Sequence, residues 1–228
     1  IVNIGLEGMM VIGTWFGAWA GWFYGPWYGV LAGLLGGALF GLIHAVGTIT
    51  FQVDHIVSGV AINILAAGVA RFLSVVAYAD VPAGGATQSP RVDERIEKIS
   101  IPYLSGGKIN ESDTADVFGS LEALDLFFIS DLFGLLGGLT RNISYFSILA
   151  ILLVPVSVWI LWSTSFGLQL RSVGEYPVGS ESVGVNVYLM KYIGVTISGA
   201  FAGLAGAYLV IESCLLYTSD AADDNAGV

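Results

Sequence analysis

The stretch GTWFGAWAGWFYGPWYGVLAGLLGGALFG, residues 13–41, has glycine at every fourth position. Residues four apart lie on one face of a helix, so the repeat predicts a continuous seam of small residues. Such seams allow close packing of transmembrane helices. The seam could surround a translocation path or serve general membrane packing. Gly25-Pro26 interrupts the run between aromatic residues that suit a membrane–water interface, namely Trp22, Tyr24, Trp27 and Tyr28. The stretch therefore predicts two helices, residues 9–24 and 27–46.

The composition of the whole chain agrees with a membrane protein. Its 228 residues are 55% hydrophobic and only 11% charged, and they include 31 glycines, whereas about 25% of the residues in soluble domains are charged. About 20 apolar residues cross a bilayer, which predicts further spans at 56–79, 143–166 and 192–211. The expected fold is an all-α polytopic membrane helical bundle with about five spans and lipid around it. Scattered basic residues argue against a nucleic-acid partner.

Two polar groups interrupt the apolar sequence near the N-terminus. The passage VNIGLEGMM, residues 2–10, contains Asn3 and Glu7. An ionisable group at bilayer depth costs several kcal/mol, which favours a role in a solute pathway. Alternatively, Glu7 caps a helix at the water interface. Asn63, in the passage SGVAINILA, is expected to bond across helices or to touch substrate.

A polar passage, GLQLRSVGEYPVGSESVGVNV, occupies residues 167–187 between two apolar segments. It contains a Gly-Glu-x-Pro turn, in which Gly174 would tolerate unusual backbone angles and Pro177 would fix φ. The amphipathic run that follows predicts a brief helix along the membrane face, and Val183 and Val185 are expected to pack into a partner's groove or against the membrane helices.

These three passages resemble the permease subunits of ABC importers for branched-chain amino acids, simple sugars and nucleosides, and the first is closest to nucleoside-type permeases. The resemblance implies a cytoplasmic coupling loop, residues 167–190, that docks on a cytoplasmic ATPase. The residues it assigns to coupling are Arg171, Gly174, Glu175, Pro177, Ser182, Gly184 and Asn186. Those it assigns to the substrate pathway are Asn3, Glu7 and Asn63. Tyr176 departs from the family's usual Asn, and Val178-Gly179-Ser180 replaces a basic residue and two alanines, which puts ATPase affinity in doubt.

The resemblance also implies the rest of a transporter. It predicts a second permease subunit forming a heterodimer, an extracytoplasmic solute-binding lipoprotein, and a multi-pass location in a bacterial or archaeal cytoplasmic membrane. The chain would translocate nucleosides or related small polar solutes by alternating access. It would have no cofactor and no enzymatic activity, because it contains no Gly-x-x-x-x-Gly-Lys-Ser/Thr loop for ATP.

Residues 80–142 form the only long polar region, and the two arguments about its side of the membrane disagree. Its basic residues, Arg91, Arg95, Lys98, Lys108 and Arg141, favour the cytoplasm by the positive-inside rule. The resemblance places it outside the cell, and we follow the resemblance because acids neutralise these charges. Residues 108–139 look like an insertion, and residues 121–139 are apolar enough to lie on the membrane.

The ends of the chain suggest a partial permease domain, residues 1–212. Residues 214–224 back-translate to a run that resembles a transposon adapter used in sequencing libraries. Residues 213–228 are therefore expected to be a non-native tail, and further spans are expected beyond the fragment.

Two other classes of function fit the sequence less well. An ion-coupled carrier or channel should show intramembrane acids on several helices, and only Glu7 fits. A membrane enzyme needs a cluster of nucleophile, base or metal ligands. His44 and His55 lack a third ligand for a metal.

Overall fold

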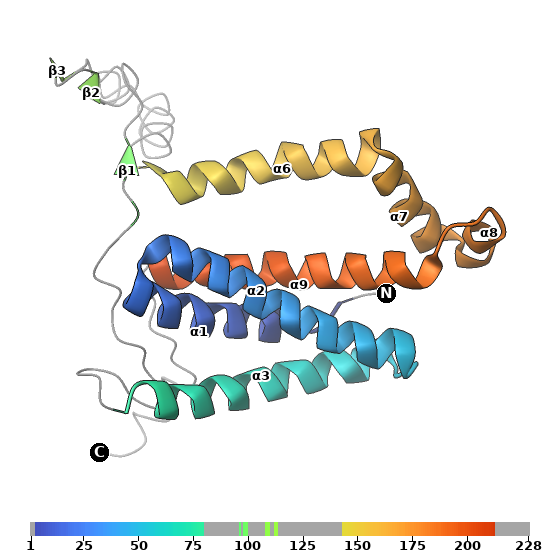
Figure 1. Ribbon diagram of the computed structural model, residues 1–228, viewed down its shortest axis with the longest axis horizontal. Coiled ribbons are helices and arrows are strands. Elements are labelled where there is room, and N and C mark those ends of the chain that lie inside the picture. The colour runs from blue at the N-terminus through green and yellow to red at the C-terminus, as the bar shows by residue number, and fades with distance from the viewer. Residues whose placement is uncertain are drawn as a thin grey trace, which may run out of the picture. The chain divides into compact units, whose positions relative to one another are not determined.

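The computed structural model describes residues 3–79, 96, 98–99, 108–109, 112–113 and 143–212, and most of these residues are helical (Figure 1). The first helices are α1 (Leu6–Tyr24), α2 (Pro26–Ala45), the π-helix η1 (Val46–Thr50) and α3 (His55–Ala77). The later ones are α6 (Tyr145–Ser163), α7 (Ser165–Glu175), α8 (Pro177–Ser182) and α9 (Val187–Glu212). The all-α prediction is confirmed.

The chain divides into two compact units, one formed by Ile1–Arg95 with Ser157–Val228 and the other by Ile96–Val156. The described residues of the second unit include four strands of two residues each. In it β1 (Lys98–Ile99) pairs antiparallel with β4 (Ile143–Ser144), and β2 (Lys108–Ile109) pairs with β3 (Ser112–Asp113). Most of the polar region 80–142, including the apolar passage 121–139, lies outside the described residues, as does the tail 213–228.

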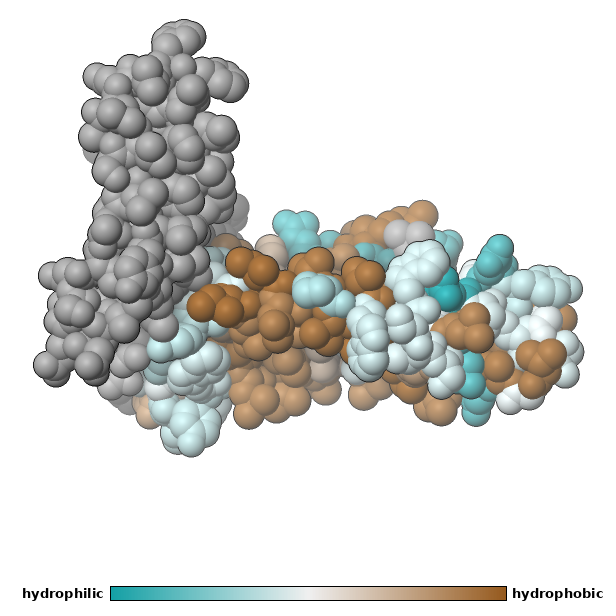
Figure 2. Space-filling model, turned by 90° about the horizontal axis from the view of Figure 1, so that it is seen from above, coloured by the Kyte–Doolittle hydropathy of each residue, from teal (hydrophilic) through white to brown (hydrophobic). Residues whose placement is uncertain are grey.

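Four helical segments of the described residues are long and apolar enough to cross a membrane: Pro26–Thr50, His55–Ala77, Tyr145–Ser163 and Val187–Glu212. They present large apolar side chains on their outer surfaces, such as Ile64, which is 70% exposed, and Ile151, which is 68% exposed. Figure 2 shows hydrophobic side chains gathered along one face of the molecule. Helix α1, the remaining expected span, is not among these four, and it packs against α2, α3 and α9.

The glycine seam is the contact surface of three helices. A Cβ atom built on Gly37 of α2 would lie 2.6 Å from the Cα atom of Gly203 of α9, and one on Gly33 would lie 2.9 Å from the carbonyl oxygen of Gly13 of α1. Real Cβ atoms do not approach other atoms so closely, so these backbones meet only because side chains are absent. The predicted packing seam is confirmed, and on α9 its partners include Gly199, Gly203 and Ala207.

Capping groups explain where helix ends differ from the predicted ends. The turn at Gly25-Pro26 is confirmed, because Gly25 has φ +101° and Pro26 begins α2. The predicted end of a helix at residue 46 is wrong, since η1 continues the helix to Thr50. Helix α6 stops at Ser163, before the predicted residue 166, because the Thr164 hydroxyl accepts a hydrogen bond from the Gly167 amide and starts α7. Helix α9 begins at Val187 rather than 192, since Asn186 Oδ1 accepts from the Leu189 amide.

Candidate functional site

Contacts along the seam fix the relative directions of the helices in the first unit. Gly41 of α2 packs beside Gly199 of α9, whereas Gly29 packs beside Ile211, so α2 and α9 are antiparallel. The end of η1 therefore lies at the start of α9, where the hydroxyls of Thr50 and Tyr192 are hydrogen-bonded. We call this the coupling end, because α7 and α8 directly precede α9 there.

Helix α3 runs away from the coupling end. Its first turns pack on the start of α1, where a Cβ atom built on Gly59 would lie 2.9 Å from the Cβ atom of Ile4. Its last turns lie beside the middle of α1, where Trp15 Nε1 donates to Ser74 Oγ over 2.9 Å. The chain therefore leaves α3 on the side opposite the coupling end.

Helix α1 begins inside the bundle rather than at either end of it. Asn3 Nδ2 donates to Ser198 Oγ over 3.2 Å, and Ser198 lies eleven residues into α9. At about 1.5 Å per residue, this is about 16 Å along the axis of α9 from the coupling end. Glu7, in the first turn of α1, is therefore near the middle of the apolar spans. This depth favours a pathway role for Glu7 over a cap at the water interface.

Asn63 is a cap for the start of α1. Its Oδ1 accepts from the Gly8 amide over 2.8 Å, and its Nδ2 donates to the Ile4 carbonyl over 3.3 Å. Gly5, the N-cap residue of α1, has no side chain to do this, and the first amides of a helix need partners from elsewhere. Asn63 therefore forms the expected hydrogen bond across helices.

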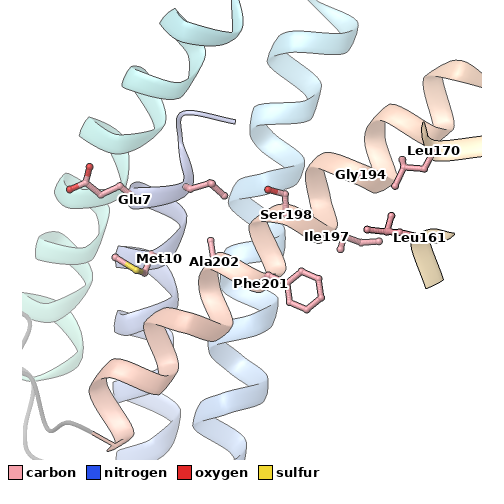
Figure 3. Close-up of a pocket in the computed structure, with 10 residues that line it drawn as sticks. Glu7, Met10, Leu161, Leu170, Gly194, Ile197, Ser198, Phe201 and Ala202 are labelled. Atoms are coloured by element: carbon pink, nitrogen blue, oxygen red, sulfur yellow. The ribbon is translucent and has the colours of Figure 1, made fainter. Parts of the chain in front are cut away.

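A cavity of about 740 Å³ lies beside the start of α1 (Figure 3). Its lining residues are Leu6, Glu7, Met10, Leu161, Leu170, Gly194, Ile197, Ser198, Phe201 and Ala202. The wall is almost entirely apolar, and only Glu7 and Ser198 bring polar side chains to it. Ligand sites typically enclose about 300–1,000 Å³ and combine apolar walls with a few polar groups, so the cavity has the size and composition of a site for a small solute.

The polar passage before α9 folds into α7 and α8. Pro177 begins α8 as predicted. Gly174, however, lies inside α7 and has no positive φ, so the prediction that it adopts unusual backbone angles is wrong. Gly184, with φ +87°, supplies the left-handed turn between α8 and α9 instead. Glycine tolerates that conformation because it has no Cβ.

Charged and apolar side chains of this passage remain available on its surface. Glu175 and Ser182 are exposed, Val183 is 78% exposed, and Val185 is half-buried. Arg171 is exposed too, but its guanidinium lies 4.2 Å from the ring centre of Trp162, a cation–π contact. Arg171 therefore holds α7 against the end of α6.

Comparison with known proteins gives the family. The family described as "Branched-chain amino acid transport system / permease component" matches residues 1–216. The chain belongs to this family. Its family and its apolar helices together make the chain part of a multi-pass permease of the cytoplasmic membrane. No solved structure matches it.

Three relatives of this permease have transport names. The guanosine ABC transporter permease protein NupQ of Bacillus subtilis (strain 168) is 40% identical over 96% of the chain and 61% of its own length. The nucleoside ABC transporter permease protein NupC of Lactococcus lactis subsp. cremoris (strain MG1363) is 34% identical over 91% of the chain and 57% of its own length. The putative glucose ABC transporter permease protein TsgC13 of Haloferax volcanii is 26% identical over 95% of the chain and 56% of its own length. The chain spans about three fifths of the length of these relatives.

Two of the three predicted pathway residues of this permease, Glu7 and Asn3, lie at the cavity, and each contributes to it differently. Glu7 lines the cavity, and Asn3 reaches its wall through Ser198. Sequence reasoning missed Ser198 and Trp162. A single serine in an apolar helix has no distinctive pattern around it, but Ser198 directly precedes Gly199 of the seam and so lies close to the face where helices meet. No cluster of three potential metal ligands occurs among the described residues.

Proposed function

We propose that this permease is the transmembrane subunit of an ATP-driven importer that translocates nucleosides or related small polar solutes by alternating access. The observation that carries the proposal is the cavity beside Glu7, at mid-depth of the apolar spans, in a chain that is similar to guanosine and nucleoside permeases. A carboxylate at that depth suits a solute that carries hydrogen-bond donors.

The partners follow from the same proposal. A cytoplasmic ATPase docks on the passage 167–190. That partner, and not this chain, hydrolyses ATP. A second permease subunit completes a heterodimer, and an extracytoplasmic solute-binding lipoprotein delivers the solute. Residues of this chain proposed to contact the ATPase are Arg171, Gly174, Glu175, Pro177, Ser182, Gly184 and Asn186.

The direction of the helices supports the proposed orientation. Because α3 ends opposite the coupling end, the polar region 80–142 starts on the other side of the bundle from α7 and α8. If α7 and α8 meet a cytoplasmic ATPase, the polar region begins on the extracytoplasmic side. This agrees with the family resemblance and not with the count of positive charges.

The test is reconstitution of the full-length permease with its ATPase and its binding protein in proteoliposomes. We expect uptake of labelled nucleoside that requires ATP, the ATPase and the binding protein. Uptake that persists without the ATPase and follows an ion gradient would instead favour an ion-coupled carrier, and uptake without any energy source would favour a channel.

A further inference from the structure

A hollow of about 300 Å³ opens at the coupling end of this permease, and we call it the coupling hollow. Its wall combines three separate parts of the chain: the end of η1 with the turn 51–54 that leads into α3, helix α8, and the start of α9. Among its lining residues are Gln52, Val178, Glu181, Tyr188 and Lys191. Figure 1 shows α8 and the end of α2 at the same end of the helices. The turn 51–54 and the polar passage before α9 therefore share one surface.

Gln52 keeps a strained backbone conformation at this hollow. Its φ is +53°, and among the described residues other than glycine only Gln52 has a positive φ. The conformation ends the helix, because it lets the Val53 amide donate to the Gly47 carbonyl over 3.1 Å. Glycine or asparagine usually occupies such a position, since a Cβ atom is unfavourable there. The chain instead has a long, exposed amide side chain at this point, and strain of this kind is common where a residue contacts a ligand or partner.

The accessible charge at the coupling end is mainly negative. Glu181 is exposed and Lys191 is half-buried, and neither forms an ion pair with another residue that the structure describes. The carboxylates of Asp54 and Glu175 are exposed at the same end. Arg171 is exposed too, but its guanidinium is already held against an aromatic ring of α6. Because protein partners align through opposite charges, this surface suits a partner with basic side chains.

We propose that the coupling hollow is a docking site for the cytoplasmic ATPase, and that it receives an arginine side chain of that partner. A guanidinium presents several N–H donors in one plane, and the unpaired Glu181 carboxylate would accept from them. The Gln52 amide supplies a further acceptor at the wall. Val178 is 68% exposed and Tyr188 is 59% exposed, so the wall also offers apolar and aromatic surface to the arginine stem.

This inference rests on the proposed function and adds the turn 51–54 to the ATPase contact. The turn is linked to the helices of the seam, because the Thr50 hydroxyl just before it is hydrogen-bonded to Tyr192 of α9. The turn also continues directly into α3. An ATPase that holds the coupling hollow would therefore hold α2, α3 and α9 together, and not only α7 and α8.

The experiment measures the affinity of the purified full-length permease for its ATPase in detergent, together with thermal unfolding of each permease variant alone. Gln52→Gly relieves the strain and removes the side chain. It should leave the melting temperature equal or higher and yet weaken ATPase binding about three- to tenfold. A residue with a purely structural role would not weaken binding while stability is kept. Gln52→Asn is the matched control, since asparagine tolerates positive φ and keeps the amide, so its affinity should stay closer to that of wild type.

Two charge variants test the chemistry of the partner group. Glu181→Gln should weaken ATPase binding by a similar factor, because the amide keeps the shape of the side chain but loses its charge. Lys191→Gln should strengthen binding, since it removes a charge that repels arginine. The opposite pair of effects would show that the hollow receives an acidic group and would overturn the inference.

Wild-type affinity of both Gln52→Gly and Glu181→Gln for the ATPase would also overturn the inference. ATP-dependent uptake by the wild-type transporter would in that case leave the proposed function standing. A wild-type permease that neither binds the ATPase nor supports ATP-dependent uptake would overturn both.

Discussion

Gly203 of α9 and Gly37 of α2 are in backbone contact, such that a Cβ atom built on Gly203 would lie 2.7 Å from the Cα atom of Gly37. The same Cβ atom would also crowd the carbonyl oxygen of Gly33. Both neighbours are backbone atoms and cannot rotate away. The distance between α2 and α9 is therefore set by the absence of side chains at this point.

Gly203→Ala should push α2 and α9 apart and lower the free energy of unfolding by about 1–3 kcal/mol, the usual range for overpacking. Thermal unfolding of the full-length protein in detergent measures the change. Gly68→Ala is the matched control on α3, where nothing lies within 4 Å of an added Cβ atom. Alanine favours helix over glycine by about 1 kcal/mol, so Gly68→Ala should leave stability equal or higher. Equal behaviour of the two variants would contradict the assigned contact.

Asn63→Ala should destabilise the start of α1, because it removes the acceptor for the Gly8 amide and the donor to the Ile4 carbonyl. Gly8 is buried, and leaving a buried amide without a partner costs about 1–3 kcal/mol, which thermal unfolding would detect. Asn63→Asp keeps the acceptor and loses only the donor, so its loss should be smaller. If Asn63→Ala has wild-type stability but abolishes nucleoside binding, the amide acts on the solute and not as a cap.

The helices of this permease could be predicted because each leaves a local pattern. The four-residue glycine step and Gly25-Pro26 locate α1 and α2. What could not be predicted depends on contacts between distant residues. Nothing around Asn63 shows that it caps a helix more than fifty residues earlier, and nothing around Ser198 shows that Asn3 bonds to it. The depth at which α1 begins follows only from these contacts.

The polar passage 167–187, called the coupling passage for its proposed role, shows the same limit on a smaller scale. Gly174 and Gly184 are both glycines in this polar passage, where a turn is expected, yet of the two only Gly184 has positive φ. The difference arises because Thr164 starts α7 early enough for it to include Gly174. Side-chain capping thus decides which glycine makes the turn.

Gly184→Ala should strain the turn between α8 and α9, since a non-glycine residue in the left-handed region costs roughly 1–2 kcal/mol. Gly174→Ala is a close control, because nothing lies within 4 Å of a Cβ atom built on either glycine. Protease digestion at the coupling passage of the purified protein should be faster in Gly184→Ala than in wild type. It should be unchanged in Gly174→Ala, and the reverse order would refute the assignment of the turn.

Asp54 makes stability at the start of α3 depend on pH. The amides of Ile56 and then Val57 donate to its carboxylate and lower the pKa of Asp54 below its usual value. The folded pKa is thus below the unfolded value of about 3.9, so the contribution of Asp54 is fully present above about pH 4 and is lost as the pH falls through the folded pKa. Asp54→Ala should lower the melting temperature at pH 7, and its difference from wild type should shrink in acid. Asp54→Asn also caps but does not titrate, so its melting temperature relative to Asp54→Ala should not shrink in this way.

Replacing Arg171 and Glu175 together by alanine should weaken association with the ATPase and uncouple hydrolysis from uptake, without changing which solute is preferred. Both side chains are exposed on α7, next to the turn that begins α8. Because Arg171 also stacks on Trp162, the double variant could act by loosening α7 from α6. Trp162→Leu removes that stacking and keeps both charges, so it separates the two causes. Pull-down of the ATPase and solute-stimulated hydrolysis are the readouts. Normal values of both in the double variant would reject the coupling role, and an equal loss in Trp162→Leu would assign the effect to the packing of α7.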